Sequence, residues 1–368
     1  MSTTMAPNVK SVNTPGKHTV YSMCGMCSVR CPIEVTVEDG RVTWLQGNTH
    51  DKAIGASLCA KGAAGIAFES DDQRPQTPLI RTGPRGSGQW RRASWDEALE
   101  LAVSWMKPLR ETAPEKLAFF TGRDQSQSFT GWWAQAFGTP NYAAHGGFCS
   151  VNMAAGGIYT IGGAFWEFGQ PDWDRTKLFV MFGVAEDHDS NPIKMGLGKL
   201  KGRGARVIGV NPIRTGYNAI ADDWYGITPG TDGLLILSLL HCLLQAGKVD
   251  LEYLARWTNA PLLVNEADGP EKGLILKNAE SQPFVIDKRT GAPAPWDGKG
   301  VQPDLGATWQ GHRTVFQHMA ERYLGPEYAP EAVAERCGIP AARIRSLAAE
   351  LADVAFNQAI EIKQVWTD

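Results

Sequence analysis

The chain has 368 residues, of which 43% are hydrophobic and 20% charged, and its formal net charge is −3. This is an ordinary globular composition, and the length suffices for two or three hydrophobic cores. The small net charge gives no reason to expect nucleic acid or an acidic membrane surface as a partner. Seven cysteines are too few for a disulfide scaffold and indicate metal ligation in a reducing compartment.

The N-terminal residues 1–16 are polar, and we expect them to form a disordered tail. Residues 1–23 contain no apolar segment and no arginine, so they predict neither a secretory nor a twin-arginine export signal. The longest apolar run, Leu234–Leu244, is too short to cross a bilayer. We therefore expect a cytoplasmic chain that reaches a membrane only through partner subunits.

Four cysteines near the N-terminus carry the strongest signal in the sequence. They follow the spacing Cys-x2-Cys-x3-Cys-x27-Cys and are Cys24, Cys27, Cys31 and Cys59. Four thiolates suit either an iron–sulfur cluster or a structural zinc ion. Zinc sites usually pair two Cys-x2-Cys turns, whereas three ligands in one loop and a distant fourth suit a cubane. The spacing therefore favours a [4Fe–4S] cluster over zinc and over four buried structural cysteines.

A β-hairpin is predicted directly after the third cysteine. Apolar residues alternate along Ile33–Leu45 on either side of Asp39-Gly40, which is a strong two-residue turn signal. This hairpin provides a rigid base for the cysteine loop. A short helix is expected over Gly62–Phe68, just after Cys59.

The next segment predicts a helix, a strand and a long loop. Ser94–Glu97 has the pattern of a capping box, and an amphipathic helix over Ala98–Leu109 follows it. Leu117–Thr121 predicts a short strand. Arg123–Cys149 shows no clear period, which is typical of a loop that lines a site or of an irregular packed connection.

A strand–helix–strand unit with a parallel sheet is predicted next. Its parts are Lys177–Gly183, Pro192–Lys201 and Ala205–Val210. Ligands in such sheets bind beyond the carboxyl ends of the strands. We therefore expect a binding edge at Gly183–Asn191 and Asn211–Thr215.

A strongly apolar helix is predicted over Leu234–Gln245, ending at Gly247. Thr231 or Asp232 precedes it as the N-cap, where exposed amides favour a polar ligand, although the residues taken alone are more typical of a plain N-cap. Three further segments predict a surface excursion and two helices: residues 266–312, Pro330–Arg336 and Ala341–Val354.

Taken in order, these features resemble the N-terminal part of a catalytic subunit of the molybdopterin oxidoreductase (dimethyl-sulfoxide-reductase) superfamily. The matching segments are the four cysteines with Lys61, the capping-box helix, Gly138–Asn141, Cys149, Asn211-Pro212 and Pro229–Asp232. They extend over residues 17–355. The resemblance implies an α/β chain, in which a small N-terminal iron–sulfur domain precedes Rossmann-like α/β domains with parallel sheets.

The resemblance also implies domain boundaries. The iron–sulfur domain would cover residues 17–75, and a partial α/β cofactor domain would combine residues 76–145 with 320–368. A Rossmann-like cofactor-binding domain would cover residues 146–319. Full subunits of the superfamily are longer and end in a β-barrel domain, so we expect this chain to be an N-terminal fragment without that barrel.

Within the superfamily, Phe120–Gln127, His145–Asn152 and Phe182–Pro192 are similar to the molybdenum subunit of the cytoplasmic, membrane-associated sulfite dehydrogenase. This implies oxidation of sulfite to sulfate. Electrons would leave through the [4Fe–4S] cluster, first to a ferredoxin-like iron–sulfur subunit, then to a membrane-anchor, quinone-reactive subunit. The alternatives are a cluster-only electron-transfer module, a formate-dehydrogenase-like subunit, or a polysulfide or thiosulfate reductase subunit.

The cofactor implied is Mo-bis(molybdopterin guanine dinucleotide), and Cys149 matches the position that holds the metal. Taken alone, Cys149 is more typical of a buried inert thiol. Gly146 and Gly147 lack side chains and let backbone approach a bulky cofactor. Lys61 matches a lysine between cluster and pterin, although without the resemblance it reads equally as a surface lysine.

Further cofactor contacts are implied at the predicted binding edge. Asn211 and Asp232, with Thr231 beside it, match contacts to guanine and ribose. Superfamily members usually have Gly-x-Asn after the first strand; here Gly183 is followed by Val and Ala, which leaves Asn191 as the substitute.

A sulfite dianion requires positive groups near the metal. Arg123 and His145 are the catalytic candidates for that role. Both residues are equally suited to pairing with cofactor phosphates or with nearby carboxylates.

Overall fold

A computed structural model describes residues 13–27, 29–51, 56–122, 127–147, 150–163, 171–184, 191–214 and 216–362, with the backbone alone at 127, 150, 191 and 192. The chain divides into two compact units. The first comprises Met1–Pro171 with His188–Met195, and the second comprises Asp172–Asp187 with Gly196–Asp368. None of the helices in the described ranges has both the length and the apolar content needed to cross a membrane.

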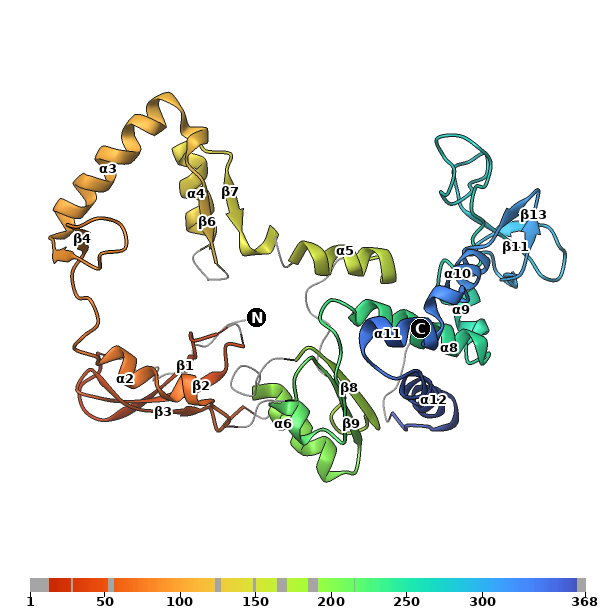
Figure 1. Cartoon of the computed structure of the whole chain (residues 1–368), viewed down its shortest axis with the longest axis horizontal. Coiled ribbons are helices and arrows are strands. Elements are labelled where there is room, and N and C mark those ends of the chain that lie inside the picture. The colour runs from red at the N-terminus through yellow and green to blue at the C-terminus, as the bar shows by residue number, and fades with distance from the viewer. Residues whose placement is uncertain are drawn as a thin grey trace, which may run out of the picture. The chain divides into compact units, whose positions relative to one another are not determined.

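The first unit begins with a three-stranded antiparallel sheet of β1 (His18–Met23), β2 (Pro32–Glu38) and β3 (Arg41–Gly47) (Figure 1). The predicted hairpin is confirmed: Asp39 and Gly40 form the turn between β2 and β3, and both have positive φ. A left-handed conformation at both positions matches the twist of the strands. The first strand, β1, was not predicted.

Alternate residues of β2 form the core of this sheet. Ile33, Val35 and Val37 are buried, and Leu45 and Leu58 pack against them. The short helices α1 (Ala60–Ala63) and α2 (Gly65–Glu69) lie beside β3. This core is small, so the cysteine-bearing part of the chain has limited hydrophobic stabilisation of its own.

The rest of the first unit contains two small sheets and three helices. The elements are β4 (Leu79–Arg81), β5 (Trp90–Arg92), α3 (Trp95–Thr112), β6 (Phe119–Thr121), α4 (Gln127–Phe137), β7 (Tyr142–Ala144) and α5 (Ser150–Ile161). β4 and β5 pair antiparallel, and β6 and β7 pair parallel.

The prediction of an irregular loop over Arg123–Cys149 is wrong in the part that the structure describes, because α4 and β7 lie within it. The ring of Trp133 in α4 packs 5.3 Å from that of Phe119. Phe129 and Trp132, in contrast, are exposed on the same helix. An amphipathic helix is recognised by apolar residues that recur on one face. Because α4 has aromatic residues on both faces, its sequence lacks this pattern.

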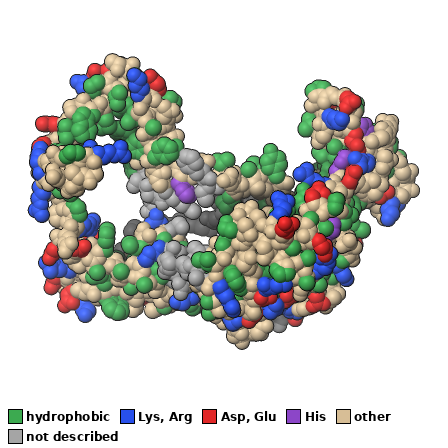
Figure 2. Space-filling model, in the orientation of Figure 1, with side chains coloured by type: hydrophobic (Ala, Val, Ile, Leu, Met, Phe, Trp, Pro, Cys, Tyr) green, Lys and Arg blue, Asp and Glu red, His purple; other side chains and the backbone are tan. Residues whose placement is uncertain are grey.

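The predicted capping box at the start of α3 forms only in part. Ser94 Oγ accepts a hydrogen bond from the Glu97 amide at 3.1 Å, which caps the helix. The Glu97 carboxylate does not return to the Ser94 backbone and instead pairs with Arg91 of β5. A nearby arginine competes successfully with a backbone amide because both partners of the ion pair are charged. Trp95, Leu99 and Val103 of α3 are exposed. Hydrophobic side chains reach the surface on the face of the molecule that Figure 2 shows.

The second unit is built on a three-stranded parallel sheet in the order β10–β9–β8 (Figure 1). Its strands and connecting helices are β8 (Leu178–Phe182), α6 (Asn191–Gly202), β9 (Arg206–Val210), α7 (Tyr217–Ile220) and β10 (Asp223–Tyr225). The predicted strand–helix–strand unit is thus confirmed as β8, α6 and β9, in parallel register. The third strand, β10, was not predicted.

Three helices cover one face of this sheet and enclose the main core. They are α8 (Asp232–Gln245), α11 (Pro330–Cys337) and α12 (Ala341–Asn357). Ile208 and Tyr225 of the sheet pack with Leu235, Val333 and Ile344 of the helices. Gly247 has φ +62°, and the amide of Lys248 donates to the carbonyl of Leu243 at 2.9 Å. The predicted glycine stop of α8 is therefore confirmed as a Schellman motif.

The expected surface excursion folds around a core of its own. After α9 (Leu251–Trp257) come β11 (Phe284–Ile286), β12 (Pro293–Pro295), β13 (Thr308–Trp309), β14 (His312–Arg313) and α10 (Val315–Tyr323). Leu263, Phe284, Ile286 and Ala307 form the buried cluster of this region.

Candidate functional site

The first three predicted cluster ligands lie in the connection between β1 and β2. Met23 and Pro32 are paired across these strands, so the loop of residues 24–31 leaves and re-enters the sheet at one point. The amide of Cys24 donates to the carbonyl of Cys31 at 2.8 Å and closes the loop. Antiparallel pairing thus brings the first and third cysteines together, and Cys27 lies in the loop between them.

The fourth predicted ligand, Cys59, is the N-cap residue of α1, and this helix lies against the cysteine loop. The evidence is Gly62: a Cβ atom at this position would lie 3.4 Å from Cys24 Sγ and 2.4 Å from Leu58 Cδ1. The helix thus passes close to Cys24 of the loop, and a side chain at position 62 would also collide with Leu58 just before the helix. Lys61 precedes Gly62 in the same short helix, which places this residue beside the cysteine segment.

The donor set fits an iron–sulfur cluster. Within the described ranges, no group of three or more His, Cys, Asp or Glu side chains is arranged to hold a metal ion. In a cubane, each thiolate binds its own iron, so the four sulfur atoms need not converge on one point as the ligands of a single ion must. Two cysteines joined by strand pairing, and a third that starts a helix which passes close to Cys24, are consistent with that arrangement.

Of the three predicted catalytic residues, the structure describes His145, which lies at one edge of the β6–β7 sheet. Thr121 and Ala144 are paired at the carboxyl ends of these parallel strands. His145, Gly146 and Gly147 follow β7 as a 3-10 turn, and His145 is half-buried. A Cβ atom at either glycine would meet no atom within 4 Å, so the backbone there borders open space, as an approaching cofactor requires.

Arg123 and Cys149 lie outside the described residues. In sequence, Arg123 comes two residues after the end of β6, and Cys149 comes five residues after the end of β7. Their roles stay predictions.

The second predicted site is the carboxyl edge of the β8–β9–β10 sheet. Phe182, Val210 and Tyr225 are the last residues of the three strands and lie in register. Gly183 follows β8 with φ +59°, and its amide donates to the carbonyl of Val210 at 3.0 Å. Asn211 follows β9. The structure therefore brings Gly183 and Asn211 together at one edge, as the predicted parallel sheet requires.

Asn211 is bonded mainly through its backbone. Its amide donates to the carbonyl of Tyr225 at 3.1 Å, and its own carbonyl accepts from the Trp224 indole at 2.9 Å. Among the described residues, the side-chain amide makes only long contacts: Nδ2 donates to the carbonyl of Val184 at 3.4 Å, and Oδ1 accepts from the Ile213 amide at 3.5 Å. These distances exceed those of a good hydrogen bond, so the amide remains available to a ligand.

The start of α8 follows the carboxyl end of β10 in the chain. Pro229 and Gly230 (φ +81°) form a tight turn that is closed by a hydrogen bond from the Thr231 amide to the carbonyl of Thr228. Thr231 is the N-cap residue, but its Oγ1 donates to the carbonyl of Thr228 at 2.7 Å instead of capping the helix. Asp232 begins the helix, and the described residues offer its carboxylate no hydrogen-bond donor.

Asn191, the predicted substitute for the family asparagine, begins α6, and its side chain lies outside the description. The residue that the sequence analysis missed is Trp224. The three residues of β10 are too few to show the alternation by which a strand is recognised. Two adjacent β-favouring aromatic residues, Trp224 and Tyr225, were the only local signal.

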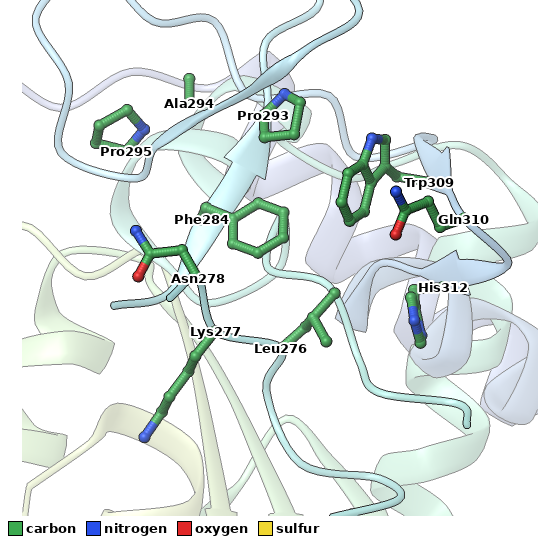
Figure 3. A pocket seen from close by; sticks show the side chains of 10 residues that line it. All are labelled: Leu276, Lys277, Asn278, Phe284, Pro293, Ala294, Pro295, Trp309, Gln310 and His312. Carbon is green, nitrogen blue, oxygen red and sulfur yellow. The ribbon is translucent and has the colours of Figure 1, made fainter. Parts of the chain in front are cut away.

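A pocket of about 420 Å³ opens elsewhere in the second unit, in the excursion that contains β11–β14 (Figure 3). Phe284 and Trp309 meet edge to face at its base, 5.5 Å apart, and the prolines of β12 form one wall. None of the predicted cofactor or cluster residues lines it.

Comparisons with known proteins bear on both sites. The family model of the molybdopterin oxidoreductase Fe4S4 domain matches residues 17–71, and that of molybdopterin oxidoreductase matches residues 74–303. A sulfite dehydrogenase subunit of Allochromatium vinosum is 43% identical over 94% of this chain and 37% of its own length. The thiosulfate reductase molybdopterin-containing subunit of Salmonella typhimurium is 30% identical over 68% of this chain and 32% of its own length.

A solved structure shows the same fold. Acetylene hydratase from Pelobacter acetylenicus superposes with a TM-score of 0.61 over 91% of this chain and 38% of that one, at 20% sequence identity. The chain thus spans between about a third and two fifths of the length of these relatives. The predicted α/β architecture is confirmed by this likeness.

Proposed function

Because the chain belongs to the molybdopterin oxidoreductase family, we propose that it is the part of a molybdenum enzyme that holds a [4Fe–4S] cluster and one side of a molybdopterin guanine dinucleotide cofactor. We further propose that the whole subunit oxidises sulfite to sulfate. The observation that carries this proposal is the 43% identity to a sulfite dehydrogenase subunit over 94% of the chain.

The cofactor, when bound, supplies the two-electron redox chemistry. The residues of this chain bind and orient it. Cys149 holds the metal through its thiolate, a soft ligand suited to a soft metal centre. Gly146, Gly147 and Gly183 permit close approach of the backbone.

The nucleotide end of the cofactor lies at the edge of the β8–β9–β10 sheet. Asn211 donates through its side-chain amide, and the carboxylate of Asp232, to which no described residue donates, accepts from amino and imino N–H groups. Thr231 and the first amides of α8 add donors, and Asn191 contributes from the start of α6.

The substrate is a dianion and requires positive charge. Arg123 and His145 provide it beside Cys149, at the edge of the β6–β7 sheet. Cys24, Cys27, Cys31 and Cys59 would hold the cluster, which would supply one-electron transfer, and Lys61 would lie between the cluster and the pterin. The partners would be a ferredoxin-like subunit and a quinone-reactive membrane-anchor subunit, with the enzyme at the cytoplasmic face of the membrane.

The direct test is anaerobic purification, followed by iron and molybdenum counts and an assay with sulfite and an artificial electron acceptor. We expect both metals and sulfite-dependent reduction of the acceptor. Cys149→Ser should lose molybdenum and activity but keep iron, whereas Cys242→Ser, in α8, should keep all three. Full sulfite turnover by Cys149→Ser would contradict the assignment of the metal ligand.

The alternatives give other outcomes in the same experiment. Iron without molybdenum in the wild-type protein would favour a cluster-only electron-transfer module. Reduction of thiosulfate by a reduced dye, without sulfite oxidation, would favour a reductase like the Salmonella relative. Formate oxidation would favour a formate-dehydrogenase-like subunit.

A further inference from the structure

Trp224 links β10 to the carboxyl end of β9. It is the middle residue of β10, so its side chain lies on the opposite face of the sheet from those of Asp223 and Tyr225. Its indole Nε1 donates to the carbonyl of Asn211 at 2.9 Å, while the Asn211 amide donates to the carbonyl of Tyr225 at 3.1 Å. The backbone of Asn211 is thus held from both sides by one short strand.

The position of the indole depends on Gly226, two residues further along the chain. A Cβ atom on Gly226 would lie 2.8 Å from Cη2 and 2.9 Å from Cζ2 of Trp224. The clash is with the six-membered ring of the indole, which is rigid and can avoid it only by moving as a whole. A residue other than glycine would therefore push the indole away from Asn211.

The strand that carries Trp224 is itself anchored to α12. The Arg343 guanidinium lies 4.0 Å above the Tyr225 ring and donates to the carbonyl of Trp224 at 3.0 Å. Arg343 also pairs with Asp223. A charged, planar group that makes three contacts to consecutive residues leaves β10 little freedom to shift.

We propose that Trp224 is a positioning residue for the cofactor site, in which its indole N–H fixes the backbone of Asn211 so that the Asn211 side-chain amide faces the nucleotide end of the cofactor. This inference rests on the proposed function. The hydrogen-bond lengths of Asn211 support the proposal. Its backbone hydrogen bonds are 2.9 and 3.1 Å long, whereas the contacts of its side-chain amide are 3.4 and 3.5 Å long. Because the backbone of Asn211 is already fixed, less conformational entropy is lost when its side-chain amide binds the cofactor.

The test compares Trp224→Phe, which keeps an aromatic ring but removes the N–H, with Asn211→Ala and with the double variant. The readouts are the molybdenum-to-iron ratio after anaerobic purification and hydrogen exchange of the segment that contains Asn211. We expect Trp224→Phe to lower the ratio about fivefold, as the loss of one hydrogen bond predicts, at unchanged iron content. It should also speed exchange at Asn211.

If Trp224 acts through Asn211, the double variant should retain as much molybdenum as Asn211→Ala alone. Gly226→Ala, which keeps the N–H but displaces the ring, should lower the ratio as Trp224→Phe does. Trp257→Phe is the matched control, because Trp257 is 74% exposed on α9 of the same unit, and it should leave both readouts unchanged.

An unchanged ratio in Trp224→Phe would overturn the inference and leave the proposed function intact, as would additive losses in the double variant. Wild-type protein that contains iron but no molybdenum would overturn the proposed function, and the role of Trp224 with it.

Discussion

At the scale of single residues, Glu266 and Arg313 form an ion pair that joins the two ends of the excursion. Glu266 accepts from Arg313 of β14 through both carboxylate oxygens, at 3.0 and 3.2 Å, and from the Arg313 amide at 3.0 Å. Its carboxylate is partly shielded from solvent. These hydrogen bonds to the charged form lower the pKa of Glu266 from 4.5 to about 2.

Acid should therefore weaken this anchor. Because the pKa of Glu266 is lower in the folded state, its contribution to stability is fully present above pH 4.5 and is lost as the pH falls towards 2. We expect Glu266→Gln to reduce the free energy of unfolding by about 1–3 kcal/mol at neutral pH and to flatten its decline between these pH values. Chemical denaturation from pH 7 to pH 2 measures both effects.

Glu280→Gln is the control for this experiment, because the described residues form no ion pair with the exposed Glu280. It should reproduce the wild-type profile. An equally steep acid decline in Glu266→Gln and in the wild type would show that other carboxylates control this transition.

At the scale of elements, the ends of the helices are set by local chemistry. Gly247 ends α8 in a left-handed conformation with φ +62°, and Thr314 starts α10 with a complete capping box to Gln317. Gly198, in contrast, lies inside α6, where a Cβ atom would meet no atom within 4 Å. Glycine is thus required at position 247 and not at position 198.

Alanine substitution should separate these two glycines. Gly247→Ala should destabilise the protein by about 1 kcal/mol, since alanine is strained at positive φ. Gly198→Ala should stabilise it by about 0.5–1 kcal/mol, because glycine inside a helix costs conformational entropy. Thermal or urea unfolding of the two variants provides the measurement, and shifts of the same sign would contradict this account of the α8 C-terminus.

At the scale of the whole molecule, the two units differ in what stabilises them. The sheet of the second unit packs against α8, α11 and α12 through a core that includes Leu235, Ile344 and Leu347. In the part of the chain that the structure describes, the apolar core of the sheet that carries the cysteine loop consists of Ile33, Val35 and Val37, with a few partly buried neighbours. A cluster that joins the loop of residues 24–31 to Cys59 would supply the missing cross-link.

Removal of iron should therefore affect one part of the chain. We expect a chelator to increase hydrogen exchange in β1, β2 and α1 at least tenfold, equivalent to about 1.4 kcal/mol, and to leave β8 and β9 unchanged. Cys59→Ser should have the same effect without a chelator, and Cys337→Ser, at a buried position of the second unit, should leave β1 and β2 protected. Equal loss of protection in both units would contradict a local structural role of the cluster.

Much of this architecture was accessible from the sequence because its signals are local. The Asp39-Gly40 turn, the cysteine spacing and the β8–α6–β9 unit each rest on residues close in the chain, and the structure confirms the hairpin and the parallel unit. The aromatic helix α4 was missed because both of its faces are apolar. The capping-box pattern predicted that Glu97 bonds to the backbone of Ser94. It pairs with Arg91 instead, which belongs to the neighbouring strand β5.

The sequence by itself determined the kind of chemistry, since four cysteines at a cluster spacing restrict the ligand regardless of how the remainder folds. Only the tertiary structure decided how Asn211 is held. Its bond to Trp224 joins residues 13 positions apart across two strands, and that contact exists only once β10 has paired with β9 and been fixed by Arg343 of α12. Strand pairing depends on packing between distant segments, which no local pattern encodes.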